Sequence, residues 1–227
     1  MFRQPSMGLT DLISWAIDTM PVTSPPGQTF AYSNFGYCVL GRVIELVTGQ
    51  RYADHVRDRI LRRCGVDEMI IARNTLGERA AGAVRYVGQH GESPYTVNVL
   101  RMDSHGGWIA TPRDLVRFTT HVDGFATTPD MLRADTIARM VTPSAANMGY
   151  AKGWSVNRLN SWWHDGSLPG TQSILVRTAS GFCWAALTNT RRPQSDMGRA
   201  LDELMWQVVQ QVTDWGAVAA RPTRSDG

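Results

Sequence analysis

The spacing of apolar residues changes once along this chain, close to Gly153, and that change restricts the fold more than any other feature of the sequence. Upstream, apolar residues recur every three or four positions, which is the period of helices that bury one face. Downstream, they fall into short runs rich in Trp, Val and Ala that are typical of strands. The predicted helices span 9–20, 35–47, 52–64 and 134–141, and the predicted strands span 153–157, 162–164, 172–178 and 182–188.

The end of the chain combines a hairpin with a further helix. Ala179-Ser180-Gly181 is a turn between the last two predicted strands. An amphipathic segment over 195–214 follows, with its apolar residues on one stripe. We therefore predict an α+β fold in which a helical region precedes an antiparallel sheet, with a C-terminal helix packed on the sheet.

The middle of the chain is rich in loops. Within 66–107, the segments Val84–Val87 and Tyr95–Val99 fit short strands. A helix start follows, with Thr111 as N-cap, Pro112 at the first helical position and Asp114 at the third. The pattern as a whole predicts one domain over 1–215, mainly helical over about 35–150 and formed by strands and a helix over about 151–215. Residues 216–227 are predicted to be a disordered tail.

Charge and composition exclude several classes of protein. The net charge is +3, and the 23 basic residues are spread along the chain, so we expect no nucleic-acid partner. No stretch reaches the length of a membrane span, and the first residues carry no apolar signal core. As written, the chain is predicted to be cytoplasmic, a prediction that lapses if the true N-terminus lies upstream. The three cysteines and five histidines show no metal-ligand spacing, so no metal or cofactor is expected.

Two short motifs hold the candidate functional residues. Tyr32-Ser33-Asn34 stands between a Pro-Gly turn and an apolar helix, where Asn34 also fits a purely structural role as the helix N-cap. His164-Asp165-Gly166 lies on a predicted strand, where His164 alone would be an ordinary strand histidine beside a Gly-rich hairpin. Gly166 allows another chain or a ligand to approach the strand edge closely.

Two further segments place these motifs in a larger pattern. Gly106–Phe118 contains Gly-Gly-x-x-x-Thr-x-x-Asp-Leu-x-x-Phe, and Ala185–Asn189 ends an apolar strand in Thr-Asn. With Tyr32-Ser33-Asn34 and His164-Asp165-Gly166, they follow the order of serine hydrolases of the β-lactamase and penicillin-binding-protein type. The chain resembles the C-terminal portion of that family over roughly 20–212. Because four elements occur in order, an accidental match by an unrelated α+β protein is disfavoured.

The resemblance implies a fold and a set of roles. The fold would be a partial β-lactamase/transpeptidase-like fold, similar to class C β-lactamases, DD-peptidases and related esterases. Tyr32 would help to move the proton of the nucleophile, and Asn34 would bind the carbonyl or amide of the substrate. His164 would present a positive or hydrogen-bonding group to the substrate. Beside Gly166, the backbone N–H of Ser167 would be one oxyanion-hole donor.

One signature of the family is not in the sequence. The motif Ser-x-x-Lys would supply the nucleophile, but Lys152 is the only lysine and Gly149 stands three residues before it. A tyrosine needs a nearby cation to act as a base near neutral pH, because its ordinary pKa is about 10. The loop Asp103-Ser104-His105 does not replace the missing group, because three neighbours on one loop cannot align as a triad.

The sequence therefore leaves two functional hypotheses. The first is a serine hydrolase that transfers an acyl group from a small ester, β-lactam or D-amino-acid peptide, but that is inactive or weakly active as this chain alone. The second is a non-catalytic protein that binds a ligand or partner in the same cleft. Without the family's first helix and strands, apolar surface and a strand edge are expected to be exposed. A second copy or an N-terminal segment would cover them.

Overall fold

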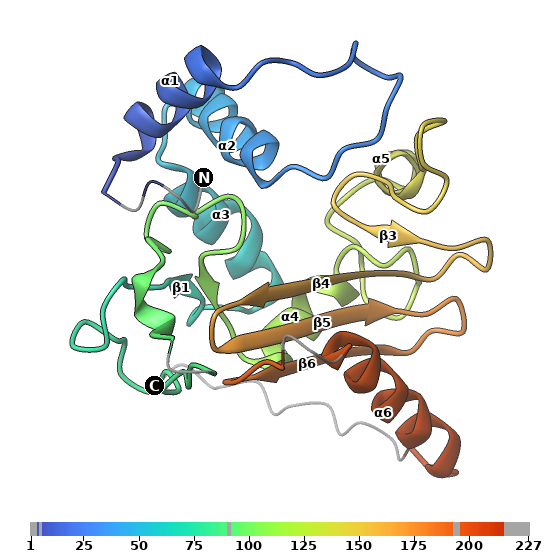
Figure 1. Ribbon diagram of the computed structural model, residues 1–227. Helices are drawn as coiled ribbons and strands as arrows, with labels where there is room; N and C mark the ends of the chain where they lie inside the picture. The colour runs from blue at the N-terminus through green and yellow to red at the C-terminus, as the bar shows by residue number, and fades with distance from the viewer. Residues whose placement is uncertain (1–3, 5, 90–91, 193–195, 216–227) are drawn as a thin grey trace, which may run out of the picture.

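An antiparallel sheet near the C-terminal end of the chain organises the fold (Figure 1). In this computed structural model, the residues described are 4, 6–89, 92–192 and 196–215. The four strands lie in the order of the sequence and are β3 (Ser155–Val156), β4 (Trp162–Leu168), β5 (Thr171–Arg177) and β6 (Cys183–Thr188). Each pairs antiparallel with the next, as the short connections predict.

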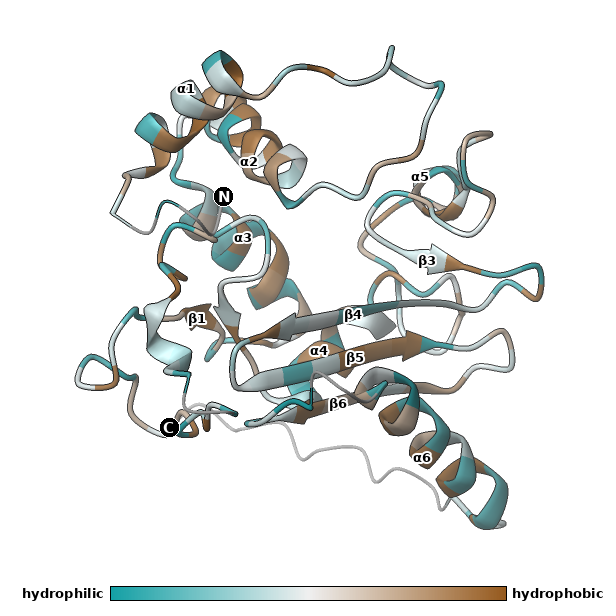
Figure 2. Cartoon of the chain, in the orientation of Figure 1, coloured by the Kyte–Doolittle hydropathy of each residue, from teal (hydrophilic) through white to brown (hydrophobic). Residues whose placement is uncertain are grey.

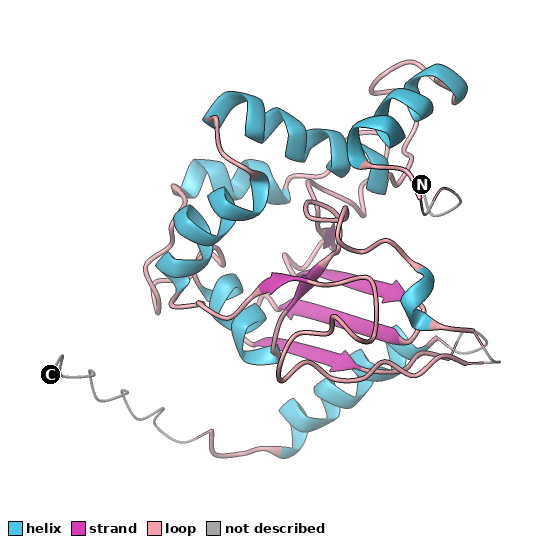
Figure 3. Cartoon of the chain, turned by 90° about the vertical axis from the view of Figure 1, so that its left-hand side faces the viewer, coloured by secondary structure: helices cyan, strands magenta, loops and turns pink. Residues whose placement is uncertain are grey.

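Helices cover both faces of this sheet (Figure 3). On one face, helix α6 (Met197–Gln211) packs Leu201, Met205 and Val209 against a cluster formed by Ile174, Val176 and Trp184. On the other face, α4 (Pro112–Thr120) and α5 (Ala134–Val141) pack against Trp154, Val156 and Trp162. The α+β fold with a C-terminal helix packed on the sheet is therefore confirmed.

The first part of the chain is helical, also as predicted. Helix α1 spans Leu9–Thr19 and α2 spans Asn34–Thr48. The predicted helix over 52–64 is continuous but changes its hydrogen-bonding pattern, from α3 (Tyr52–Val56) through a π-helical turn, η1 (Arg57–Leu61), to a 3-10 turn, η2 (Arg62–Cys64). Gly49 and Gly65 end these segments in the left-handed conformation, which glycine adopts without steric cost.

Local signals fix the start of α4 as the sequence predicts. The backbone N–H of Asp114 donates to Oγ1 of Thr111, and the backbone N–H of Thr111 donates to Oδ2 of Asp114 at 3.0 Å. This reciprocal capping box satisfies two donors that the first turn of a helix leaves open. Pro112 occupies a position where no intrahelical N–H bond is lost.

The prediction of strands at Val84–Val87 and Tyr95–Val99 is wrong. Both segments are loops, except for a 3-10 turn, η3 (Pro94–Thr96), in which Oγ of Ser93 accepts from the backbone N–H of Tyr95. The region instead flanks a small two-stranded sheet of β1 (Ile70–Ile71) and β2 (Trp108–Ile109). These strands are two residues long, so they leave no periodic signal in the sequence.

Asn34 is not the N-cap of α2, contrary to the structural alternative for this residue. Ser33 occupies that position, and its Oγ accepts from the backbone N–H of Gly36 at 2.9 Å. The side chain of Asn34, the first residue of the helix, accepts a hydrogen bond from Tyr32 instead. The amide of Asn34 is therefore not used to satisfy the helix end.

An apolar stripe on α2, formed by Leu40, Val43, Leu46 and Val47, is exposed (Figure 2). The opposite side of α2 packs so closely on the chain that a Cβ atom on Gly41 would lie 2.4 Å from Oγ of Ser104. The expected exposed apolar surface is therefore present, and it lies on α2. None of the described helices is both long enough and apolar enough to cross a membrane. The predicted tail 216–227, and Ser195 at the predicted start of the last helix, lie outside the described residues.

Candidate active site

Tyr32 stands at the entrance to α2, where the loop from the Pro-Gly turn meets the helix. The N-cap at Ser33 fixes the direction of the chain at this point. The side chain of Tyr32 is about half exposed, and its hydroxyl donates to Oδ1 of Asn34 at 3.3 Å. The two polar groups of this motif therefore contact each other at the surface.

The fold brings His164 to Tyr32 from far along the sequence. His164 lies on β4, opposite Leu175 of β5. The centroids of the Tyr32 and His164 rings are 6.3 Å apart. The structure thus places both predicted catalytic side chains in one neighbourhood, although they come from the helical part and the sheet.

The backbone of β4 is open to this neighbourhood beyond Trp163, because β3 pairs with β4 only at Trp162 and Trp163. The backbone N–H and C=O of Gln172 both bond to the Thr188 hydroxyl on β6. Gln172 therefore makes no ladder hydrogen bond to Ser167, the residue opposite it on β4. In an antiparallel ladder, a residue in such a pair points its own N–H and C=O to the other side. The N–H of Ser167 therefore points to the open edge, as an oxyanion-hole donor would require.

Gly166 is held close to β5. A Cβ atom on Gly166 would lie 2.6 Å from Oγ of Ser173, whose hydroxyl donates to the carbonyl of Gly166. A side chain at this position would have to displace the Ser173 hydroxyl. Glycine at 166 therefore serves packing within the sheet as well as the predicted approach of a ligand.

The electrostatics of the site keep Tyr32 protonated. Burial and the nearby carboxylate of Asp165 both raise the pKa of Tyr32. Burial, followed by the interaction with Tyr32, raises the pKa of Tyr37. The Nζ of Lys152 donates to the carbonyl of Thr142, and Lys152 is not among the groups that shift the pKa of Tyr32. Tyr32 can therefore act as a base at neutral pH only if a cation is brought to it from outside the described residues.

The sequence prediction did not include the aromatic residues around Tyr32. The ring of Tyr150 lies 5.4 Å from that of Phe30, 6.1 Å from that of Tyr32 and 6.5 Å from that of His164, measured between centroids. Tyr150 belongs to an irregular segment between α5 and β3, where no periodicity marks a residue as part of a site. Only the folded arrangement reveals that it joins the other three.

The loop Asp103-Ser104-His105 forms no triad. Oδ2 of Asp103 accepts from the guanidinium of Arg42 at 2.6 Å, and the ring nitrogens of His105 are buried without a hydrogen-bond partner. This partly buried ion pair belongs to the packing beneath α2. Within the described residues, no group of three His, Cys, Asp or Glu side chains is arranged to hold a metal ion.

Comparison with known proteins places this geometry in a family. A sequence model of the Beta-lactamase family matches residues 6–205. Penicillin-binding protein 4 of Amycolatopsis lactamdurans is 29% identical over 187 residues, which are 73% of this chain and 48% of that protein. Unguisins hydrolase ungD' of Aspergillus campestris is 27% identical over 212 residues, which are 85% of this chain and 39% of that protein. The chain spans less than half the length of either relative.

Solved structures show the same fold. D-amino acid amidase from Ochrobactrum anthropi SV3 matches with a TM-score of 0.69 and 21% identity, over 90% of this chain and 63% of that one. A penicillin binding protein from Bacillus halodurans matches with a TM-score of 0.69 and 21% identity, over 86% and 62% of the two chains. The family model matches residues 6–205, the Tyr-Ser-Asn motif stands at a helix start, and a histidine lies beside it on an open strand edge. The chain therefore belongs to the β-lactamase family of serine hydrolases.

Proposed function

We propose that this chain supplies the substrate-facing part of a serine acyl-transfer site, and that a Ser-x-x-Lys segment on additional polypeptide supplies the nucleophile and a cation. The observation that carries this proposal is the approach of Tyr32 and His164 to 6.3 Å beside the open edge of β4. An acyl group bound along that edge would meet the N–H of Ser167 on the strand and Asn34 on the helix.

Each residue has a chemical role in this proposal. The added lysine lowers the pKa of Tyr32, which then receives the proton of the attacking serine. The amide of Asn34 binds a carbonyl or amide of the substrate, and His164 contributes a hydrogen bond from the strand. The N–H of Ser167 stabilises negative charge on the reacting carbonyl oxygen. Gly166 allows the substrate to lie against the strand.

We infer the substrate class from the site and from the names of the relatives together. Acyl transfer of this kind acts on an ester, a β-lactam or a D-amino-acid peptide or amide. Names among the matching proteins include a penicillin-binding protein and a D-amino acid amidase. Another structure of this fold, from Pyrococcus abyssi, is described as octameric, with a TM-score of 0.66. Self-association through the exposed stripe of α2 is therefore one way in which this surface would be covered.

The raised pKa of Tyr32 favours a second function. Because burial and the charge of Asp165 both raise its pKa, this tyrosine is poorly suited to accept a proton within the chain alone. The same side chains can bind a ligand without cleaving it. Under this alternative the chain is a binding protein that retains the cleft of the family.

Ligand binding by the isolated chain tests the shared part of both functions. An ¹⁵N-labelled sample would be titrated with a penicillin, an acyl-D-amino-acid amide and a small ester. We expect shifts of the amide signals of Asn34 and of residues 164–167, and their loss in the Tyr32→Phe/His164→Ala double variant. Tyr95→Phe, which removes a hydroxyl elsewhere, is the matched control. Unchanged binding by the double variant would contradict both functions.

Acylation separates the two functions. When a Ser-x-x-Lys segment from the natural coding sequence is joined to the chain or added to it, the enzyme hypothesis predicts one covalent acyl group per site with a penicillin or an activated ester. If the isolated chain binds these ligands but is not acylated even when the Ser-x-x-Lys segment is present, the result would instead support the binding-protein function.

A further inference from the structure

Tyr150 connects three separate segments of the candidate active site. Its ring contacts Phe30 and Tyr32 in the approach to α2, and it also contacts His164 on β4. The Tyr32 and Tyr150 rings meet nearly edge to face, at 86°, which is a favourable arrangement for aromatic pairs. A single side chain thus contacts both of the residues to which the proposed function assigns proton transfer and substrate contact.

The backbone around Tyr150 is fixed against the sheet. The N–H of Val156 donates to the carbonyl of Gly149 at 2.9 Å, and Tyr150 forms an isolated antiparallel bridge with Ser155. The side chain of Asn147 accepts from the N–H of Gly149 at 2.8 Å. These bonds place Tyr150 beside β3, on the side away from the β3–β4 pairing, and hold its ring near the point where β4 becomes unpaired.

The Tyr150 hydroxyl is paired with one nitrogen of His164. Its oxygen lies 3.4 Å from Nε2 of the imidazole. Burial, with additional contributions from Tyr37, Tyr32 and Asp165, raises the pKa of Tyr150 to about 12, so the hydroxyl keeps its proton. A neutral imidazole carries one donor and one acceptor nitrogen, and the partner of one nitrogen selects the role of the other.

We propose that Tyr150 is a positioning residue: its hydroxyl donates to Nε2 of His164, which fixes the imidazole in the tautomer with hydrogen on Nδ1 and holds the ring beside Tyr32. The catalytic value of this arrangement rests on the proposed function, but the tautomer itself does not. The strand then offers a substrate a neutral N–H donor from His164. The 3.4 Å separation is long for a hydrogen bond, as is common in unliganded sites, and we expect it to shorten when a ligand binds.

Nitrogen NMR of the histidine rings tests the proposal on the 227-residue chain. At pH 8, above the ordinary imidazole pKa of about 6.5, long-range ¹H–¹⁵N spectra distinguish a nitrogen that carries hydrogen from one that accepts. The signals of His164 are assigned by their loss in His164→Asn. We expect Nδ1 to carry the hydrogen in the wild type. In Tyr150→Phe, which keeps the ring packing, the population is expected to move toward hydrogen on Nε2.

Tyr37→Phe is the matched control, because it removes a neighbouring hydroxyl that is not hydrogen-bonded to His164. We expect it to leave the His164 signals unchanged. A wild-type His164 with hydrogen on Nε2 would overturn the proposal before any variant is made. An unchanged tautomer in folded Tyr150→Phe, or an equal change in Tyr37→Phe, would also overturn it. None of these results depends on acylation, so a failure of the proposed function is recorded separately.

Discussion

Both halves of this molecule bury apolar residues, but each contains an amphipathic element, and the two elements differ in what covers them. In the sheet half, formed by β3–β6 and α4–α6, Val176 and Trp184 are only 5% and 4% exposed beneath α6. In the helical half, formed by α1–α3 with η1 and η2, Leu46 and Val47 of α2 are 85% and 79% exposed. Both segments are regular and amphipathic, so the difference lies in what covers them.

This contrast indicates that α6 covers the apolar residues on its face of the sheet, while α2 presents an apolar surface suited to contact with another polypeptide. An isolated exposed leucine is common, but a stripe of four apolar residues on one helix is a feature of binding surfaces. The candidate active site lies where the two halves meet. A polypeptide that covered α2 would also be close to Tyr32, at the start of the same helix.

The largest expected effect is at Trp184, whose ring packs edge-on against Trp206 at 4.9 Å. Trp184→Ala should lower the free energy of unfolding by about 3–5 kcal/mol, because it removes a large buried side chain and leaves a cavity. Urea denaturation measures the change. Leu204→Ala, at an exposed position on α6, is the control and should change stability little. Equal effects of the two variants would break the contrast between covered and uncovered apolar residues.

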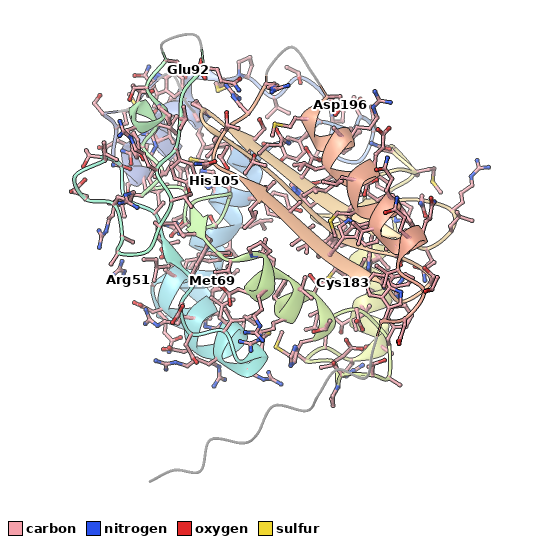
Figure 4. The ribbon with its side chains drawn as sticks, turned by 90° about the horizontal axis from the view of Figure 1, so that it is seen from below. Arg51, Met69, Glu92, His105, Cys183 and Asp196 are labelled. Atoms are coloured by element: carbon pink, nitrogen blue, oxygen red, sulfur yellow. The ribbon has the colours of Figure 1, made fainter. Side chains whose placement is uncertain are left out.

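The next effect comes from His105, which is partly buried near the charged groups of Arg42, Arg101 and Asp103 and is labelled in Figure 4. Burial is the main cause that lowers the pKa of His105 to about 4, and Arg101 and Arg42 add to the shift, although Asp103 opposes it. Between pH 6.5 and 4, the unfolded chain therefore binds a proton that the folded chain does not. The contribution of His105 to the free energy of unfolding should be fully present above pH 6.5 and should be lost as the pH drops toward 4. After solvent screening of this partly buried group, the loss should be about 1–2 kcal/mol.

Urea denaturation at pH 7.5 and 4.5 measures this loss, and His105→Gln should reduce it. The matched control is His55→Gln, which alters an exposed contact to Gln50 on the outer surface. An identical pH dependence in wild type and His105→Gln would show that His105 is not the group that titrates. The interior beneath α2 would then resemble that of the sheet half in lacking a group whose titration changes stability.

A smaller effect is expected from the capping box of α4. Thr111→Ala removes the acceptor for the N–H of Asp114 and should cost about 1 kcal/mol. Thr111→Ser keeps the hydroxyl and should restore most of that stability. Because α4 packs against the sheet, loss of the cap should weaken the sheet half first, which hydrogen exchange of β6 amides can detect. Equal stability of the alanine and serine variants would refute the role of the cap.

The smallest effect on stability is expected at the stripe of α2. Leu46→Ser should change the free energy of unfolding by less than about 0.5 kcal/mol, because the side chain is already in water. It should nevertheless reduce concentration-dependent association, which light scattering measures. Arg59→Ser, a change at an exposed polar position in η1, serves as the comparison. A large loss of stability in Leu46→Ser would show that α2 is covered within the chain.

The sequence was most informative where local signals decide the structure. The β5–β6 hairpin is an example: the N–H of Thr178 donates to the carbonyl of Phe182 at 2.8 Å, across the Ala179–Gly181 turn. The cap at Thr111 is another. By contrast, the pairing of β1 with β2 joins short segments distant in the chain, and tertiary contacts alone determine it. The π-helical turn of η1 likewise has no signature in the apolar pattern.

The candidate site was predictable only in part. Motif order is the basis on which Tyr32, Asn34, His164, Gly166 and Ser167 are proposed as site residues, since no spacing rule brings residues so far apart together. Ser33 as the helix N-cap was missed because asparagine and serine are both good caps and only the backbone decides between them. Tyr150 was missed because its position depends on an irregular segment fixed by bonds to Gly149 and Asn147.

The most direct test of the central claim is to locate the acyl group after the protein from its native host is treated with a penicillin or an activated ester. Intact mass and peptide mapping give its position. We predict one acyl group on a serine of a Ser-x-x-Lys segment outside residues 1–227, and no acyl group on the isolated 25.2 kDa chain. An acyl group on a serine within 1–227 would contradict the claim. Its absence from every associated polypeptide would contradict the catalytic function.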